Sequence, residues 1–354
     1  MMNNKNLLYL NLALDDEDVS LGFANTWIKQ FSNEFENVDI ITLNKSNENI
    51  GKNNKVNIYG LLKDDNTSRI SKFLLIRKTI KELTSTSSYD LCFSHMSPLL
   101  LLMTKFYSLK KFPTILWYTH PKPKEFSKKI ILIMSLFFCD KVVTASNSSF
   151  PYKSNKLNVV GHAIDYEQFL NKRRELLNKE FLILSRISKS KNLEVAIDGF
   201  LKSKFNKHNI SIIGDAVTKE DSEYKNKLSK KYESNKNVIF LGKIPHKDLP
   251  SLMNKYSYHI NATPEGFYDK SVLEAISNGL LSLYANKDYD KHFKKDMQFL
   301  TKFALNQRSL TNVLNSVYEQ EDKNILRIIE YSQLSVSDES IQTIFERIVA
   351  TVES

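Results

Sequence analysis

The stretch HINATPEGFYDKSVLEAISNG, residues 259–279, organises the rest of this chain. It predicts a strand, a loop and a helix, in that order. The residues up to Ala262 have the aromatic and apolar character of a short buried strand, and Pro264 and Gly266 favour a loop. From Asp269 onward apolar residues recur at helical spacing, and a glycine closes the pattern as a natural stop. With Asp269 at the N-cap, the following backbone N–H groups would point outward, and a helix start of this kind attracts phosphates.

Two carboxylates flank this predicted helix start. Glu265 lies in the loop, and Glu274 lies more than one turn into the helix. The helix start would therefore face a phosphate with an acid on either side. This combination suits a sugar nucleotide, because carboxylates accept hydrogen bonds from sugar and ribose hydroxyls while backbone amides bind a diphosphate.

The segment PEGFYDKSVLEAISNG resembles the signature of the retaining family 4 glycosyltransferases, which have the GT-B fold. That signature has a Glu-Gly-Phe loop, seven residues between two glutamates, then Glu-Ala, two variable residues and Gly. Eight residues separate Glu265 from Glu274 here, so counting back from Glu274 places Gly266 at the first glutamate. Either the loop carries one extra residue and Glu265 still reaches the sugar, or the chain follows the branch whose loop reads Thr-Gly-Ser-Leu-Asp-Lys. Asp269 and Lys270 fit that second branch.

The resemblance implies a division of roles along this segment. Glu274 would hold the ribose hydroxyls, and Glu265 would position the sugar. The remaining donor-binding positions that the resemblance implies here are Gly266, Phe267, Asp269, Lys270, Ser271 and Val272.

Length and composition indicate a globular protein of two domains. The chain has 354 residues, of which 42% are hydrophobic and 25% charged. The formal charge of +10 favours polyanions such as nucleic acid, anionic lipid or phosphorylated substrates, although a compositional bias toward Lys and Asn is an equal explanation. Cys92 and Cys139 lie in apolar surroundings and are predicted to be buried free thiols. We find no signal-peptide pattern and no apolar run of membrane-spanning length, which predicts a soluble or peripheral cytoplasmic protein.

Strands alternate with helices over the first half, which predicts parallel βαβ units in a doubly wound, Rossmann-like α/β sheet. Ligands bind beyond the carboxyl ends of such strands. Gly22 lies between the first strand and the first helix, where a glycine allows close approach to a donor. The acidic run 15–18 before it is explained by the helix dipole. His95 and His120 follow strands; His95 is interpreted as structural, and the family resemblance implies a contact between His120 and the donor sugar.

The second half repeats the βα pattern after a segment that resembles the interdomain sequence of the family, around Gly161 and Asp165. Arg186 ends a predicted strand and Lys191 starts the next helix, so both cations can converge on one anion. The resemblance implies that this pair binds the donor diphosphate, and it adds Gly214 and Ile244 as donor-binding positions, the latter near the base. The predicted domains are 1–163, with a C-terminal helix of about 337–354 crossing back to it, and 164–336.

A lysine-rich region, residues 105–129, precedes an apolar segment at 130–138. One interpretation is a peripheral membrane contact, and the alternative is a core helix with solvated ends. Aromatic residues among lysines also suit single-stranded nucleic acid, but no RNA-binding module is visible, so no nucleic-acid partner is expected.

We therefore expect a GT-B enzyme whose two Rossmann-like domains face each other across a cleft. It would move a sugar, with retention, from a nucleoside-diphosphate sugar to a saccharide or lipid-linked acceptor, in polysaccharide, lipopolysaccharide or glycolipid assembly. The predicted catalytic residues are His120, Glu265, Arg186 and Lys191, and no cofactor or metal is expected beyond the donor. The absence of GxGxxG and Walker loops argues against dinucleotide and nucleoside-triphosphate binding. A sugar-nucleotide epimerase on the same fold and a non-catalytic nucleotide-sugar-binding protein remain alternatives.

Overall fold

A computed structural model describes residues 4–14, 24–45, 55–62, 68–172 and 178–353, together with Met2, Glu175 and Leu176. The chain divides into two compact units, Met1–Gly161 with Ile341–Ser354, and His162–Ser340. The first junction lies two residues before the predicted one. The C-terminal segment joins the first unit from Ile341 rather than from 337. Gly22 and the acidic run 15–18 lie outside the described residues.

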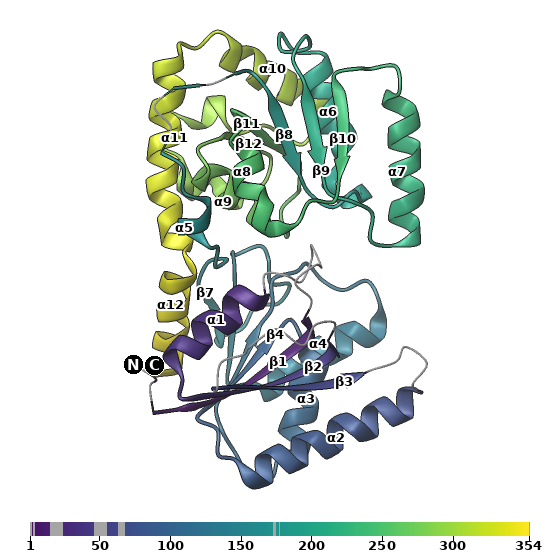
Figure 1. The fold of residues 1–354 in the computed structure, drawn as a ribbon, viewed down its shortest axis with the longest axis vertical. Helices are drawn as coiled ribbons and strands as arrows, with labels where there is room; N and C mark the ends of the chain where they lie inside the picture. The colour runs from purple at the N-terminus through teal and green to yellow at the C-terminus, as the bar shows by residue number, and fades with distance from the viewer. Residues whose placement is uncertain are drawn as a thin grey trace. The chain divides into compact units, whose positions relative to one another are not determined.

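The first unit is built on seven parallel strands in the order β3-β2-β1-β4-β5-β6-β7 (Figure 1). The order runs outward in both directions from β1 and β4, which is the arrangement of a doubly wound sheet. The strands are β1 (Asn6–Leu14), β2 (Asn37–Lys45), β3 (Val56–Leu62), β4 (Leu91–His95), β5 (Thr114–Trp117), β6 (Lys141–Thr144) and β7 (Leu157–Val159). The helices of this unit are α1 (Ala24–Glu34), α2 (Arg69–Thr86), α3 (Pro98–Tyr107), α4 (Phe126–Phe138) and α12 (Ile341–Glu353).

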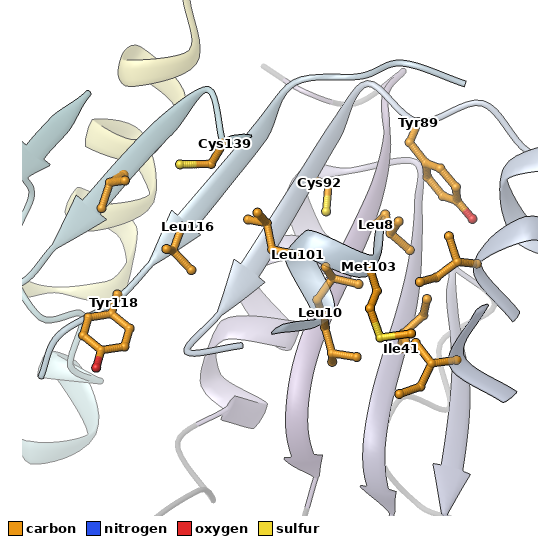
Figure 2. Packing of buried hydrophobic residues seen from close by; sticks show 14 of the residues in the cluster. Leu8, Leu10, Ile41, Tyr89, Cys92, Leu101, Met103, Leu116, Tyr118 and Cys139 are labelled. Carbon is orange, nitrogen blue, oxygen red and sulfur yellow. The ribbon is translucent and has the colours of Figure 1, made fainter. Parts of the chain in front are cut away.

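Alternation along β1 assigns the helices to the two faces of this sheet. Leu8 and Leu10 point to one face and pack in a cluster with apolar residues of α2, α3 and α4, including Leu101 and Met103 (Figure 2). Tyr9 points to the other face. There its ring contacts Phe31 of α1 at a centroid distance of 5.6 Å.

The opposite face is an aromatic core that also holds the end of the chain. Phe31 of α1 contacts Phe93 of β4 and, edge-on, Phe345 of α12, with centroids 5.0 and 5.6 Å apart. The chain therefore returns to its first unit by burying an apolar stripe of α12 against α1, as Figure 1 shows at the lower left.

The second unit contains five parallel strands in the order β10-β9-β8-β11-β12. These are β8 (Phe181–Leu184), β9 (Ile210–Ile213), β10 (Val238–Gly242), β11 (Tyr258–Asn261) and β12 (Leu281–Tyr284). Its α-helices are α5 (Tyr166–Phe169), α6 (Leu193–Leu201), α7 (Lys219–Tyr232), α8 (Leu249–Met253), α9 (Lys270–Ser277), α10 (Gln307–Tyr318) and α11 (Asp322–Val336). Five short 3-10 helices are η1 (Lys189–Lys191), η2 (His246–Asp248), η3 (Lys287–His292), η4 (Gln298–Leu300) and η5 (Ser337–Glu339).

Several local predictions need correction. β7 was not expected, because three residues are too few to show alternation. α7 was not expected either, because it is predominantly polar, although Thr218 and Asp221 form a capping box at its start. Lys191 does not start α6; it ends η1, and α6 begins at Leu193. The prediction that both cysteines are buried free thiols is confirmed.

Candidate functional site

The predicted phosphate-binding residues lie at the switch point of the second sheet. Strand order runs outward from β8 toward β9 and β10 on one side, and through β11 to β12 on the other. Ligands of doubly wound sheets bind beyond the carboxyl ends of the two strands at such a point. The loop after β8 carries Arg186 and Lys191, and the loop after β11 leads to Asp269 and α9. Two motifs that are far apart in sequence therefore meet at the edge where a ligand is expected.

A buried ion pair joins these two loops. Lys191 Nζ lies 2.6 Å from Asp269 Oδ1, and the lysine side chain is only 7% exposed. The same ammonium group lies 5.4 Å from the centre of the Phe267 ring. Burial alone would raise the pKa of Asp269, but the charge of Lys191 and hydrogen bonds from neighbouring side chains outweigh it and lower the pKa to about 2. The Asp269 carboxylate is therefore ionised at neutral pH, and its ion pair fixes the position of the lysine.

The side chain of Asp269 does not cap α9, contrary to expectation. The residue stands at the N-cap position, but its carboxylate makes no capping hydrogen bond. Its second oxygen instead accepts hydrogen bonds from Thr263 Oγ1 at 2.7 Å and Asn261 Nδ2 at 3.0 Å. The interactions of the Asp269 carboxylate are therefore with Lys191 and with residues at the end of β11 and in the loop after it. We therefore interpret Asp269 as a residue that positions Lys191.

The backbone amides at the start of α9 are partly engaged by the protein itself. The Asp269 N–H donates to the hydroxyl of Tyr289, and the Val272 N–H donates to the Asp269 carbonyl at 3.3 Å. Among the described residues no acceptor is found for the Ser271 N–H. The expectation that the amides following Asp269 point outward is therefore wrong for Val272.

Arg186 lies in the same loop as Lys191 but is placed differently. It is half-buried, and its guanidinium makes no salt bridge or hydrogen bond with any described residue. The loop is held close to the next strand at Gly214, whose φ is +132°. A Cβ atom at Gly214 would lie 1.9 Å from the carbonyl oxygen of Ser185, so only glycine fits. Gly214 thus shapes the backbone beneath Arg186.

Glu274 is buried in α9 and bonded to a histidine that the sequence analysis did not select. Its Oε1 lies 2.9 Å from His246 Nε2, in η2. Burial raises the pKa of Glu274, but the hydrogen bond and charge of His246 outweigh it and lower the pKa. Burial lowers the pKa of His246, and Glu274 more than compensates, so it is raised. The two residues are 28 positions apart, so no local sequence pattern indicated that their side chains would meet.

The remaining predicted donor-binding residues lie in α9, in the loop before it, and in the segment before η2. Glu265 is exposed and forms a salt bridge of 2.8 Å with exposed Lys287. Gly266 is buried with a φ of +92°, which explains a glycine in the loop. Lys270 is half-buried, and burial lowers its pKa to about 8 against the charges of Glu274 and Asp165. Ile244 packs beside the apolar cluster that contains Leu249 and Met253.

A second buried network supports the loop after β11 from behind, and sequence reasoning missed it. Tyr268 stacks on Tyr289 with ring centroids 4.7 Å apart, and its hydroxyl donates to Glu339 at 3.1 Å. Glu339 also pairs with Lys291 and accepts the backbone N–H of His162 at 2.6 Å. Burial would raise the pKa of Glu339, but its partners lower it to about 2. The Glu339 carboxylate, near the end of the second unit, thereby bonds to His162 at the start of the unit and to Tyr268 in the loop after β11.

His120 belongs to the first unit, three residues after β5 ends. It is exposed, and its ring contacts Tyr118 edge-on at 6.2 Å. Its predicted contact with the donor sugar stays a prediction. His95, interpreted as structural, is buried at the end of β4, where its ring lies 6.4 Å from that of Trp117. Within the described part of the chain, we find no group of three or more His, Cys, Asp or Glu residues that could hold a metal ion.

Solved structures similar to this chain over its whole length include glycosyltransferases of the GT-B type. HepE of Anabaena, solved with UDP and glucose, matches with a TM-score of 0.77 at 15% identity, covering 99% of this chain and 100% of its own. Sucrose-phosphate synthase of Thermosynechococcus elongatus matches at 0.75 and 13%, covering 99% and 98%. The lipopolysaccharide outer core galactosyltransferase WaaB matches at 0.66 and 14%, covering 98% and 99%. The predicted α/β class with the GT-B fold is confirmed.

The sequence itself also matches a family model. Residues 167–334 match the family described as Glycosyl transferases group 1. This range lies inside the second unit and contains Arg186, Lys191, Asp269 and Glu274. No curated protein matches the chain by sequence. The family match over the second unit and the glycosyltransferases among the similar solved structures together support a glycosyltransferase enzyme.

Proposed function

We propose that this protein transfers a sugar from a nucleoside-diphosphate sugar to an acceptor hydroxyl, with retention of configuration at the anomeric carbon. The observation that carries the proposal is the pair of cations in the loop after β8. Lys191 is buried and held by Asp269, whereas the guanidinium of Arg186 has no protein partner among the described residues. An arginine without a partner at a switch point suits a diphosphate, which it can bind through two oxygens.

In the proposed reaction the bond between the anomeric carbon and the diphosphate oxygen breaks, and its electron pair stays on the diphosphate. The acceptor oxygen forms the new bond on the same face of the sugar, and its proton passes to the departing diphosphate. Negative charge therefore grows on the leaving group as the reaction proceeds. Arg186 and Lys191 would stabilise that charge, and preorganised charges of this kind are among the largest contributions to catalysis. We propose that these side chains supply the stabilisation without a metal ion.

The other site residues take roles around this centre. Glu274 would accept hydrogen bonds from the ribose hydroxyls, with His246 holding its carboxylate in place and ionised. Glu265 and His120 would position the sugar. For Glu265 this requires leaving its exposed salt bridge with Lys287, which costs little because such surface pairs contribute about 0–1 kcal/mol.

UDP-sugars are the first donors to test, because HepE was solved with UDP and glucose. The acceptor we propose is a saccharide or a lipid-linked saccharide, as in polysaccharide, lipopolysaccharide or glycolipid assembly. The likeness to WaaB supports this class, since that protein acts on lipopolysaccharide outer core.

The test is donor turnover by the purified protein, measured as release of free nucleoside diphosphate from a panel of nucleotide sugars, with and without EDTA. Arg186→Ala should reduce turnover by a factor of about 100 or more, as expected when a charged transition-state contact is lost. Arg308→Ala is the matched control, because Arg308 is exposed on α10 in the same unit. Equal activity in both variants would refute the role of Arg186. Interconversion of the sugar without diphosphate release would instead indicate an epimerase, and loss of activity in EDTA would refute metal independence.

A further inference from the structure

The outer side of α4 exposes an apolar stripe that the fold itself does not use. Phe126, Ile130, Ile133 and Phe137 follow at intervals of four, three and four residues, so they line one side of the helix. All four are exposed, and Phe126 and Phe137 are 76% and 75% exposed. The inner side buries Leu132 and Ser135, and the Ser135 hydroxyl lies within hydrogen-bond distance of the carbonyl oxygens of Ile131 in the same helix and Pro98 of α3. A helix that buries only two of its residues and exposes four large apolar side chains on one side is oriented for contact with something outside the unit.

This stripe continues into an aromatic cluster at the end of α3. Phe138 contacts Phe106 edge-on at a centroid distance of 5.0 Å, and Phe137 at 5.1 Å. We call the following six residues the α4 patch: Phe106, Phe126, Ile130, Ile133, Phe137 and Phe138. The concentration is local, since 13 of the 21 large exposed hydrophobic side chains among the described residues fall within 69–138. Large apolar patches on a protein surface mark interaction sites.

The same segment carries nearly all of the net charge of the protein. Residues 69–138 contain twelve Lys and Arg against three Asp and Glu, a net charge of +9 out of +10 for the whole chain. Lys124 and Lys129 flank Phe126, and neither has an acidic partner within 4.0 Å among the described residues. Glu125 is already paired with Lys128 at 2.6 Å. The apolar stripe therefore has an uncompensated basic border.

We infer that the α4 patch and its lysines bind the surface of an anionic lipid membrane. Apolar side chains on one helix face with basic residues beside them are the composition of helices that lie in the membrane interface. The anionic headgroups satisfy the lysines, and the acyl boundary receives the phenylalanines. A neutral protein partner would leave the charges of Lys124 and Lys129 uncompensated. A second copy of this chain would bring a like charge against them.

The attachment would be peripheral. α4 has 13 residues, whereas a bilayer crossing needs about 20. No helix among the described residues is long and apolar enough to span a membrane. This inference does not depend on the donor site, because every residue it uses belongs to the first unit.

The test is sedimentation of the full-length protein with vesicles of phosphatidylcholine alone, or of phosphatidylcholine mixed with phosphatidylglycerol. Binding is expected only to the anionic vesicles and should weaken as salt is raised. The double variant Phe126→Ser with Phe137→Ser should weaken binding by a factor of about 10 or more, because each substitution removes apolar surface that the membrane would bury. Phe299→Ser, at an exposed phenylalanine of the second unit, should leave it unchanged.

A charge test separates the patch from general basicity. Lys124→Gln with Lys129→Gln should weaken binding by a factor of about 20 to 30, from roughly fivefold per lysine. Lys227→Gln with Lys230→Gln makes the same charge change on the polar helix α7 and should have little effect. Three results would overturn the inference: no binding to anionic vesicles at low salt, equal losses in the test and control variants, or a dimer in solution that disappears in the Phe126 and Phe137 double variant.

Discussion

The buried pair of Lys191 and Asp269 gives a prediction whose size follows from the structure. Asp269→Asn removes the charge but keeps the size, and leaves the ammonium group, 7% exposed, without its counterion. Removing one partner of a buried pair costs about 3–5 kcal/mol. A second estimate comes from the pKa of Asp269, which falls from 3.8 to about 2. That shift corresponds to roughly 2.5 kcal/mol of stability at neutral pH. We expect the variant to lose about 3 kcal/mol.

The pH dependence of this effect has a definite sign. Because the pKa of Asp269 is lower in the folded protein, its contribution is complete above the ordinary value near 3.8 and is lost as the pH falls toward 2. At pH 3 roughly 1 kcal/mol should already be gone. The wild-type protein and Asp269→Asn should therefore differ less at pH 3 than at pH 7.

Urea unfolding at both pH values, followed by circular dichroism, measures the difference. Asp296→Asn is the matched control, since Asp296 is exposed. The double variant Lys191→Met with Asp269→Asn should recover much of the loss, because a neutral pair leaves no isolated charge. The reasoning would be refuted if Asp269→Asn were no less stable than Asp296→Asn, or if its loss were the same at both pH values.

Three further predictions test the backbone and the second carboxylate. Gly214→Ala should cost several kcal/mol or prevent folding, because its Cβ would overlap the carbonyl oxygen of Ser185. Gly242→Ala, with φ +73° and open space around it, should cost only about 1–2 kcal/mol. Thermal unfolding compares the two variants, and equal losses would contradict the steric argument. Ala163→Gly should stabilise the folded protein by about 0.5–1 kcal/mol, because Ala163 has a φ of +58°, which glycine adopts without strain. Thermal unfolding measures this, and a loss of stability would contradict it. Glu274→Gln should lower the pKa of His246 below its ordinary value, because burial and the charge of Lys270 both lower it and only the smaller charge of Asp165 then opposes them. An NMR titration of the ring checks this, and an unchanged pKa would contradict a role for Glu274 in setting it.

Much of the fold could be read from local patterns. The alternation of strands and helices predicted two doubly wound sheets, and the loops after β8 and β11 were correctly expected to carry the cations and the start of α9. The limits were also local. Three-residue β7 shows no alternation, and polar α7 shows little apolar periodicity.

The candidate site was predicted in outline and changed in detail. Asp269 was expected to cap α9, but its carboxylate binds Lys191, 78 residues earlier in the chain. The sequence offered no sign that Glu274 would meet His246, or that Glu339 would bind the backbone of His162 from 177 residues away. α4 was interpreted either as a core helix or as a membrane contact, and only its burial shows that the phenylalanines face outward.

The sequence by itself determined the features that depend on neighbours within a few residues. These are the strand and helix periods, the loop formers, and the order of the two units along the chain. A periodic pattern needs no knowledge of what it packs against. The tertiary structure decided which charges pair, which glycines admit no side chain, and which apolar face is left uncovered. Those depend on segments brought together only by folding, where burial makes each pairing strong enough to fix a side chain in one role.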